Sequence, residues 1–101
     1  MPKVPQQYEV CRLRNGVLAV VIESNRLTVG TTRVVLPLVL ASGRVAVRHL
    51  NPKVDFGGRV FMLSPQQIAA VAVAELGEPL GTLDHERDRI TRAIDMLLSG
   101  I

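Results

Sequence analysis

Two tight-turn signals, Asn15-Gly16 and Gly57-Gly58, constrain the fold of this chain more than any other feature. Each pair stands between short apolar stretches, and such pairs join adjacent antiparallel strands because they tolerate the positive φ angles of a hairpin turn. We therefore expect one hairpin over residues 8–22 and another over residues 51–64. Because Asn and Gly both accept positive φ, both central residues of the first turn are expected to adopt it.

The run from Val17 to Ile22 is apolar at every position. A strand of this kind is covered on both faces, so we expect the core on one side and a partner subunit on the other. A third strand is expected over residues 32–38, with Pro37 near its end, where a missing N–H costs least. The chain has few aromatic residues with which to fill a core; they are Tyr8, Phe56 and Phe61. Valine, leucine, isoleucine and alanine must therefore build the interior, which favours strands over a helical bundle.

The middle of the chain is less regular. The Ser42-Gly43 break argues against a long helix over residues 39–50, so a turn and an irregular strand are expected there. Ser64-Pro65 has the form of a helix start, with a capping Ser, Pro at the first position and Gln67 at the third. The alternation that follows predicts that only one helical turn forms before another strand begins.

A helix is expected at the end of the chain. Thr82 or Asp84 can cap it, and acidic residues in its first turn suit the positive end of the helix dipole. Asp88 and Arg92 have the spacing of an ion pair across one turn. One apolar stripe recurs at three- and four-residue intervals, formed by Ile90, Ala93, Ile94, Leu97 and Ile101. Five to six strands and a terminal helix predict a single β-rich α+β domain over residues 1–101.

Composition excludes several classes of function. A net charge of +3 with scattered arginines and few aromatics indicates a solvated basic surface, not a specific nucleic-acid site. Cys11 is the only cysteine, so it cannot form an intrachain disulfide, and burial is expected for it. No apolar leader and no run long enough to span a bilayer is present, which predicts a cytoplasmic protein without membrane association.

No catalytic constellation is apparent. His49 and His85 are not spaced as metal ligands, and His85 is expected to be exposed or to cap the last helix. Gly57-Gly58 is too short to hold a phosphate and is explained by a hairpin. We therefore expect a non-catalytic protein without cofactor or metal.

An ordered set of short matches extends along most of the chain. The matching residues are Val34-Val35-Leu36-Pro37-Leu38, Asn51-Pro52, the alternating Ala69, Val71 and Val73, Gly77-Glu78, Leu83, His85, Ile90, Ala93-Ile94 and Gly100-Ile101. This set resembles the CcdB family of bacterial toxins. The resemblance implies a small antiparallel β-barrel-like sheet with a C-terminal α-helix. It also implies a homodimeric plasmid or chromosomal toxin that a cognate antitoxin neutralises.

The resemblance further implies that the protein binds the A subunit of DNA gyrase and traps the enzyme on cleaved DNA. The matching positions for gyrase binding are Arg26, Leu27, Asp95, Ser99, Gly100 and Ile101. Those for antitoxin binding lie in the first hairpin and are Arg12, Arg14 and Asn15. Two positions depart from the family: Ser99 stands where the best-known member has Trp, and Arg26 stands where an apolar residue is expected.

Two alternatives remain open. Residues 63–68 and 76–81 resemble the RNA-cleaving toxins of the MazF and PemK kind, which share this fold. Those ribonucleases usually carry Arg and often Asp after the Gln-Ile pair, whereas residues 69–72 here are apolar. Without a cation or an acid–base partner, phosphodiester cleavage lacks its usual machinery. The other alternative is a non-toxic CcdB-like protein that binds an antitoxin only, and Ser99 is the feature that favours it.

Overall fold

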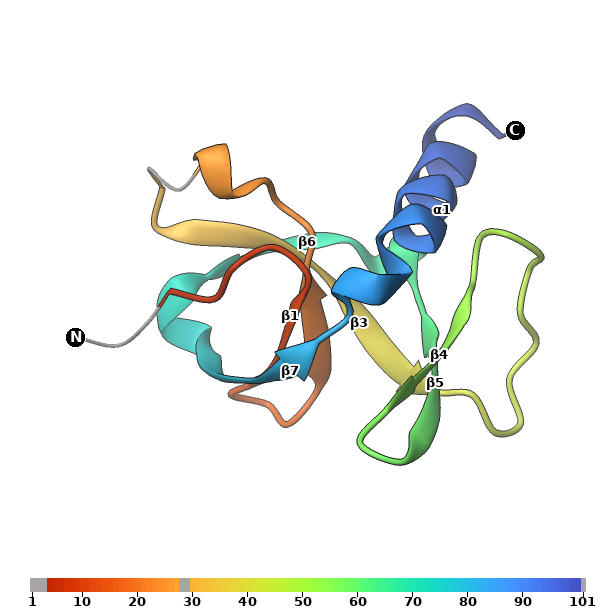
Figure 1. Cartoon of the computed structure of the whole chain (residues 1–101), viewed down its shortest axis with the longest axis horizontal. Helices are drawn as coiled ribbons and strands as arrows, with labels where there is room; N and C mark the ends of the chain where they lie inside the picture. The colour runs from red at the N-terminus through yellow and green to blue at the C-terminus, as the bar shows by residue number, and fades with distance from the viewer. Residues whose placement is uncertain (1–3, 28–29, 101) are drawn as a thin grey trace.

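The computed structural model describes residues 4–27 and 30–100, in which seven strands form one curled antiparallel sheet followed by a single α-helix (Figure 1). The strands are β1 (Glu9–Leu13), β2 (Leu18–Val21), β3 (Thr32–Leu40), β4 (Lys53–Phe56), β5 (Arg59–Leu63), β6 (Ala69–Ala72) and β7 (Leu76–Thr82). Their order across the sheet is β4-β5-β3-β2-β1-β7, and β6 pairs with β3 beside this path. The predicted β-rich α+β fold is therefore confirmed.

The strand β7 was not among the predicted strands. Its sequence, LGEPLGT, contains residues that are rare in strands, and this composition hides it. β7 pairs with β1 through an irregular register, with shifts around Cys11. Such irregularities accommodate Gly and Pro where a regular ladder would not.

The two predicted hairpins form, but their turns differ. Gly57 and Gly58 have φ angles of 59° and 78° and make the expected two-residue turn between β4 and β5. Of the two central residues of the first turn, Asn15 and Gly16, only Gly16 has a positive φ, at 93°. The register pairs Arg12 with Leu18, and Leu13 N donates to Val17 O, so the loop contains three residues. The prediction that Asn15 has a positive φ was therefore wrong, because a three-residue loop of this kind requires a positive φ only at its glycine.

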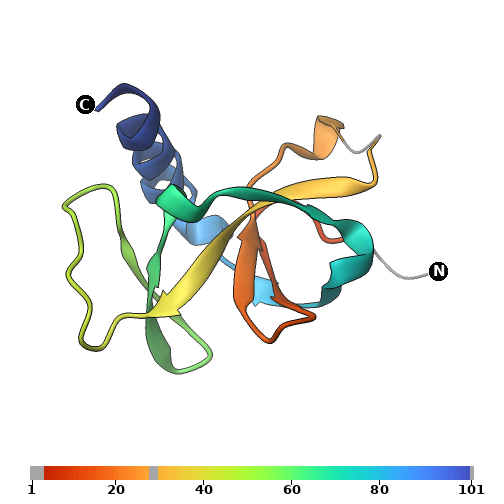
Figure 2. The same cartoon turned by 180° about the vertical axis from the view of Figure 1, so that it is seen from behind.

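The strand β3 extends to Leu40, two residues further than predicted, and Pro37 lies inside it. One side of β3 pairs with β6 as far as Val35 and with β5 from Leu38 onward. Pro37 lies between the stretches that pair with β6 and with β5, so its lack of an N–H leaves no ladder hydrogen bond unmade. Its carbonyl accepts a hydrogen bond from Ser64 N at 3.2 Å. Figure 2 shows β3, in yellow, running diagonally between the two parts of the sheet.

The strand β2 is covered on both faces, as predicted, but its own chain supplies both covers. Val20 belongs to the main core, whereas Ala19 and Val21 pack in a second cluster with Val35. These three residues of β2 are fully buried. The expectation that a partner subunit covers one face of this strand was therefore wrong.

The short segment after β5 forms one 3₁₀ turn, η2 (Pro65–Gln67), before β6, as predicted. Ser64 makes no side-chain capping bond, contrary to expectation. Gln66 instead bonds Asn51, whose Nδ2 donates to Leu63 O at 3.0 Å and whose Oδ1 accepts from Val47 N at 3.0 Å. Asn51 thus fastens the irregular segment 41–52 to the sheet.

The helix α1 (Arg87–Ser99) follows a 3₁₀ turn, η4 (Asp84–Glu86). Thr82 Oγ1 accepts a hydrogen bond from Asp84 N at 3.0 Å and so supports the start of η4. The ion pairs of this segment join Arg87 to Asp84 and Arg89 to Glu86. Among the described residues Asp88 and Arg92 form no ion pair, so that predicted pair was wrong.

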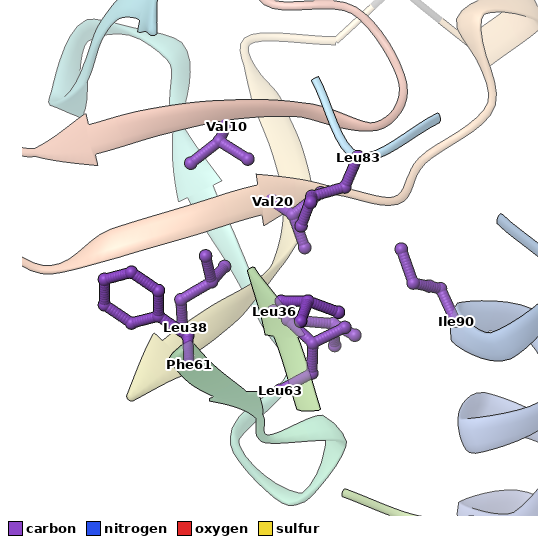
Figure 3. Packing of buried hydrophobic residues seen from close by; sticks show 9 residues of the cluster. Val10, Val20, Leu36, Leu38, Phe61, Leu63, Leu83 and Ile90 are labelled. Carbon is purple, nitrogen blue, oxygen red and sulfur yellow. The ribbon is translucent and has the colours of Figure 1, made fainter. Parts of the chain in front are cut away.

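The core lies between the curled sheet and the start of α1. Figure 3 shows Leu83 beside Val20, with Ile90 of α1 directed toward the sheet. Ile90 and Ala93 are buried, whereas Ile94 and Leu97 are half-buried. The predicted apolar stripe therefore packs mainly on its own chain, and its last member, Ile101, lies outside the described residues.

Candidate functional site

Three of the six residues predicted to bind gyrase lie at the end of α1. Asp95, Ser99 and Gly100 are exposed there, and Ile101 lies outside the described residues. Gly100 ends the helix at φ 73°, with its N–H bonded to Met96 O at 2.8 Å. Ser99 Oγ donates to Asp95 O at 2.7 Å, so this hydroxyl is turned back onto the helix.

Leu98 was missed by the sequence analysis. It is 79% exposed, the largest apolar exposure on the helix. Leu98 lies four residues after Ile94, which is the spacing of the stripe, so no local signal in the sequence marks it as exposed. It supplies an apolar side chain beside Ser99.

Arg26 and Leu27 lie in another short turn, η1 (Asn25–Leu27), after β2. Leu27 is 61% exposed. Arg26 N donates to Ser24 Oγ at 3.2 Å, and Leu27 N donates to Ser24 O at 3.0 Å. The turn therefore holds an apolar and a basic side chain at the surface.

The two groups predicted to bind gyrase are not adjacent within one chain. Figures 1 and 2 both place η1 and the end of α1 at separate positions along the long axis of the molecule. The structure thus brings Asp95, Ser99 and Gly100 together, and Arg26 with Leu27, but it does not join the two groups. We call them the helix-end patch and the η1 patch.

The residues predicted to bind antitoxin lie at the first hairpin and already contact their own chain. Arg12 Nη1 donates to Gly16 O at 3.1 Å, and Asn15 Oδ1 accepts from Val17 N at 3.0 Å. Arg14 lies 3.7 Å from a Glu75 carboxylate oxygen, and its side chain remains 73% exposed. These contacts position the three side chains without burying them.

A pocket of about 490 Å³ lies between the two hairpins. Its lining residues are Arg12, Gly16, Val17, Leu18, Leu38, Val39, Leu40, Arg44, Phe56, Gly57, Arg59, Phe61 and Leu80. We call this the hairpin pocket. It combines an apolar floor with three arginines, and its lining contains no acidic residue. Arg44, Arg59 and Leu80 were missed because they come from segments that only the fold brings beside Arg12.

The histidines provide no metal centre. His85 lies in η4 and is exposed, as predicted, whereas His49 is half-buried before β4. Within residues 4–27 and 30–100, no group of three or more His, Cys, Asp or Glu side chains could hold a metal ion. In the same part of the chain, no helix has the length and apolar character needed to cross a membrane.

The curled sheet with one terminal helix is the fold of toxins of the CcdB and MazF kind. A profile of one family, described as CcdB protein, matches residues 7–100. The chain therefore belongs to the CcdB family of toxin–antitoxin proteins, and the predicted resemblance is confirmed. Membership of this family implies an antitoxin partner.

A solved structure of similar shape comes from an endoribonuclease from Mycobacterial species. The two structures superpose with a TM-score of 0.76 and 18% sequence identity, over 97% of this chain and 94% of that chain. At this identity the similarity concerns the fold alone.

Proposed function

We propose that this protein is a non-catalytic toxin that binds the A subunit of DNA gyrase and traps the gyrase–DNA cleavage complex. The observation that carries the proposal is the family match, which extends through α1 to Gly100. The exposed end of α1 supports it, because a rigid helix end with an apolar side chain suits insertion into a groove. Figure 1 shows this end projecting away from the sheet.

The helix-end patch differs from that of the best-known family member in its apolar anchor. Ser99 is small and turned back onto Asp95 O, so it offers little apolar surface. Leu98, at 79% exposure, is the apolar side chain available at this end. We assign Leu98 the anchoring role, and the family resemblance assigns further gyrase contacts to Asp95, Ser99, Gly100 and Ile101.

A homodimer is part of this proposal. Because β2 is buried by its own chain, the apolar surface for dimerisation must come from elsewhere. The strand β6 is mostly exposed although it is composed of Ala and Val, and the adjacent Ile68 is 41% exposed. In a dimer the η1 patch, with Arg26 and Leu27, contributes a second gyrase contact.

The antitoxin is assigned to the first hairpin and the hairpin pocket beside it. Arg12 lines the pocket together with Arg44 and Arg59, which add positive charge, and Arg14 and Asn15 lie in the adjoining turn of the hairpin. A complementary partner has acidic side chains that pair with these arginines and apolar side chains that fill the floor. An acidic, apolar antitoxin segment fits this description.

A gyrase cleavage assay tests the proposal. The full chain is incubated with gyrase, ATP and supercoiled plasmid, and linear DNA is sought after protease treatment. A chain lacking Gly100 and Ile101 serves as the paired variant, and thermal unfolding checks that it folds. Linear DNA with the intact chain only is the expected result. No linear DNA, with gyrase from the source organism included, rejects gyrase poisoning; an RNA substrate then distinguishes a ribonuclease from a non-toxic antitoxin-binding protein.

A further inference from the structure

A small cleft gathers basic side chains from two distant parts of the chain. It has a volume of about 320 Å³ and is lined by His49, Pro52, Arg89 and Arg92. We call it the helix cleft, since α1 forms one wall and the segment before β4 forms the other. Its volume is near the lower limit of ligand pockets, so it suits a small chemical group. None of its lining residues is acidic.

Arg89 is a fixed part of the wall. Its Nη1 donates to both carboxylate oxygens of Glu86 at 3.0 Å, and its Nη2 donates to Lys53 O at 2.8 Å. These contacts join α1 to the start of β4 and hold the guanidinium in place. Glu86 therefore neutralises Arg89 but is not itself part of the lining.

Arg92 is the available cation of the helix cleft. Within the described ranges it makes no hydrogen bond or ion pair, although Asp88 and Asp95 lie one turn away on either side. Its guanidinium is therefore free to bind a ligand in the cleft with two parallel N–H donors.

His49 lines the helix cleft together with Arg89 and Arg92, and its backbone position is strained. Its φ of 65° is left-handed, which is unusual for a residue other than Gly. Strained residues of this kind cluster at ligand-binding positions. Desolvation, together with the charges of Arg92 and Arg48, lowers the pKa of the His49 imidazole. A positive field therefore converges on this ring, and the residues that line the cleft with it include no acidic group.

We propose that the helix cleft binds a phosphate group. Near neutral pH a phosphodiester carries one negative charge and a free phosphate compound carries up to two, and the several acceptor oxygens of either can accept from the Arg92 fork and from the His49 ring together. A carboxylate has fewer acceptor directions than either. The group can belong to a free phosphate compound or to the backbone of a nucleic acid. This site is separate from the proposed gyrase and antitoxin contacts and requires neither partner.

An NMR titration of the full chain tests the site directly. Inorganic phosphate is added at constant ionic strength, with acetate as the control anion, and the backbone amides of residues 48–53 and 87–93 are followed. With phosphate we expect amide shifts that saturate in the wild type. In Arg92→Gln we expect the affinity for phosphate to be at least about tenfold lower. The matched control Arg59→Gln removes the same charge from the hairpin pocket and should bind phosphate as the wild type does. Equal weakening in both variants, or shifts that do not saturate, would overturn the proposal.

A second titration with a short DNA duplex distinguishes the sources of the phosphate. If the duplex shifts the same amides and Arg92→Gln abolishes the effect, the ligand is a nucleic-acid backbone. If only inorganic phosphate saturates the site, the ligand is a free phosphate compound. Either result supports the helix cleft, and failure of both probes rejects it.

Discussion

Arg33 and Glu23 form a buried ion pair, with Arg33 Nη1 3.0 Å from Glu23 Oε2. The Arg33 side chain is only 1% exposed, and its Nη2 also donates to Asn25 Oδ1 at 3.1 Å. Glu23 Oε1 in turn accepts from Val34 N. One guanidinium thus fastens the start of η1 to β3, and through η1 it sets the position of Arg26 and Leu27.

We expect Arg33→Ala to lower the free energy of unfolding by about 3–5 kcal/mol, because it leaves the Glu23 carboxylate mostly buried and unpaired. Urea denaturation of the two proteins measures the change. Arg59→Ala removes an exposed arginine and should cost less than about 1 kcal/mol. A loss for Arg33→Ala no larger than that of Arg59→Ala would show that the ion pair has no structural role.

Gly81 is a position at which an added methyl group is expected to lower stability. A Cβ at this residue would lie 2.9 Å from Phe56 Cε1, so the ring would have to move. We expect Gly81→Ala to destabilise the protein by about 1–3 kcal/mol, as overpacking does. In the control Gly30→Ala, the new Cβ would have its nearest neighbour at 3.8 Å. Equal melting temperatures for the two variants would contradict the prediction.

The buried Cys11 makes stability depend on alkaline pH. Burial, followed by the charges of Glu9 and Glu78, raises the pKa of its thiol from 9.0 to about 11. The folded protein therefore disfavours the thiolate, so this stabilisation is complete below pH 9 and is lost as pH rises toward 11. The difference in unfolding free energy between the wild type and Cys11→Ala should shrink over that pH interval. All other titrating groups are the same in the two proteins, so their contributions cancel in this difference. Denaturation curves at several pH values would detect a constant difference if the prediction is wrong.

Short sequence patterns predicted the turns and helices whose geometry depends on residues adjacent in the sequence. Gly57-Gly58 forms its turn because no side chain opposes positive φ, and α1 forms where an apolar stripe meets an acidic start. β7 was missed because its Gly and Pro residues fit only beside the irregular edge of β1.

The candidate sites were predictable only in part. The end of α1 and the first hairpin are each continuous in sequence, so a family resemblance could assign candidate residues to them. Arg33 pairs with Glu23, ten positions away, whereas Arg44 and Arg92 each line a pocket whose other walls come from separate segments. No short-range pattern contains such information, because the curvature of the sheet decides which segments meet.

If the antitoxin binds in the hairpin pocket, its affinity should depend on the positive charge of the arginines there. We expect Arg59→Glu to weaken the affinity for the cognate antitoxin at least about tenfold, since it places a negative charge against an acidic partner. Arg92→Glu makes the same change on α1, outside the pocket, and should leave the affinity nearly unchanged. Isothermal titration calorimetry at two salt concentrations measures both, with weaker wild-type binding expected at higher salt. Equal effects of the two variants would place the antitoxin elsewhere.

The strength of gyrase poisoning should depend on the exposed side chain of Leu98. If this side chain anchors the helix end, Leu98→Ala should reduce the yield of cleavage complex by an amount that corresponds to about 2 kcal/mol or more of binding energy. Because Leu98 is 79% exposed, its removal should hardly affect folding, which a thermal melt can verify. Val45, which is 93% exposed in the segment before β4, provides the matched control, and Val45→Ala should poison gyrase as the wild type does. Restoring an aromatic anchor with Ser99→Trp should strengthen poisoning. If Leu98→Ala and wild type produce the same amount of linear plasmid over a concentration series, the anchor is not Leu98.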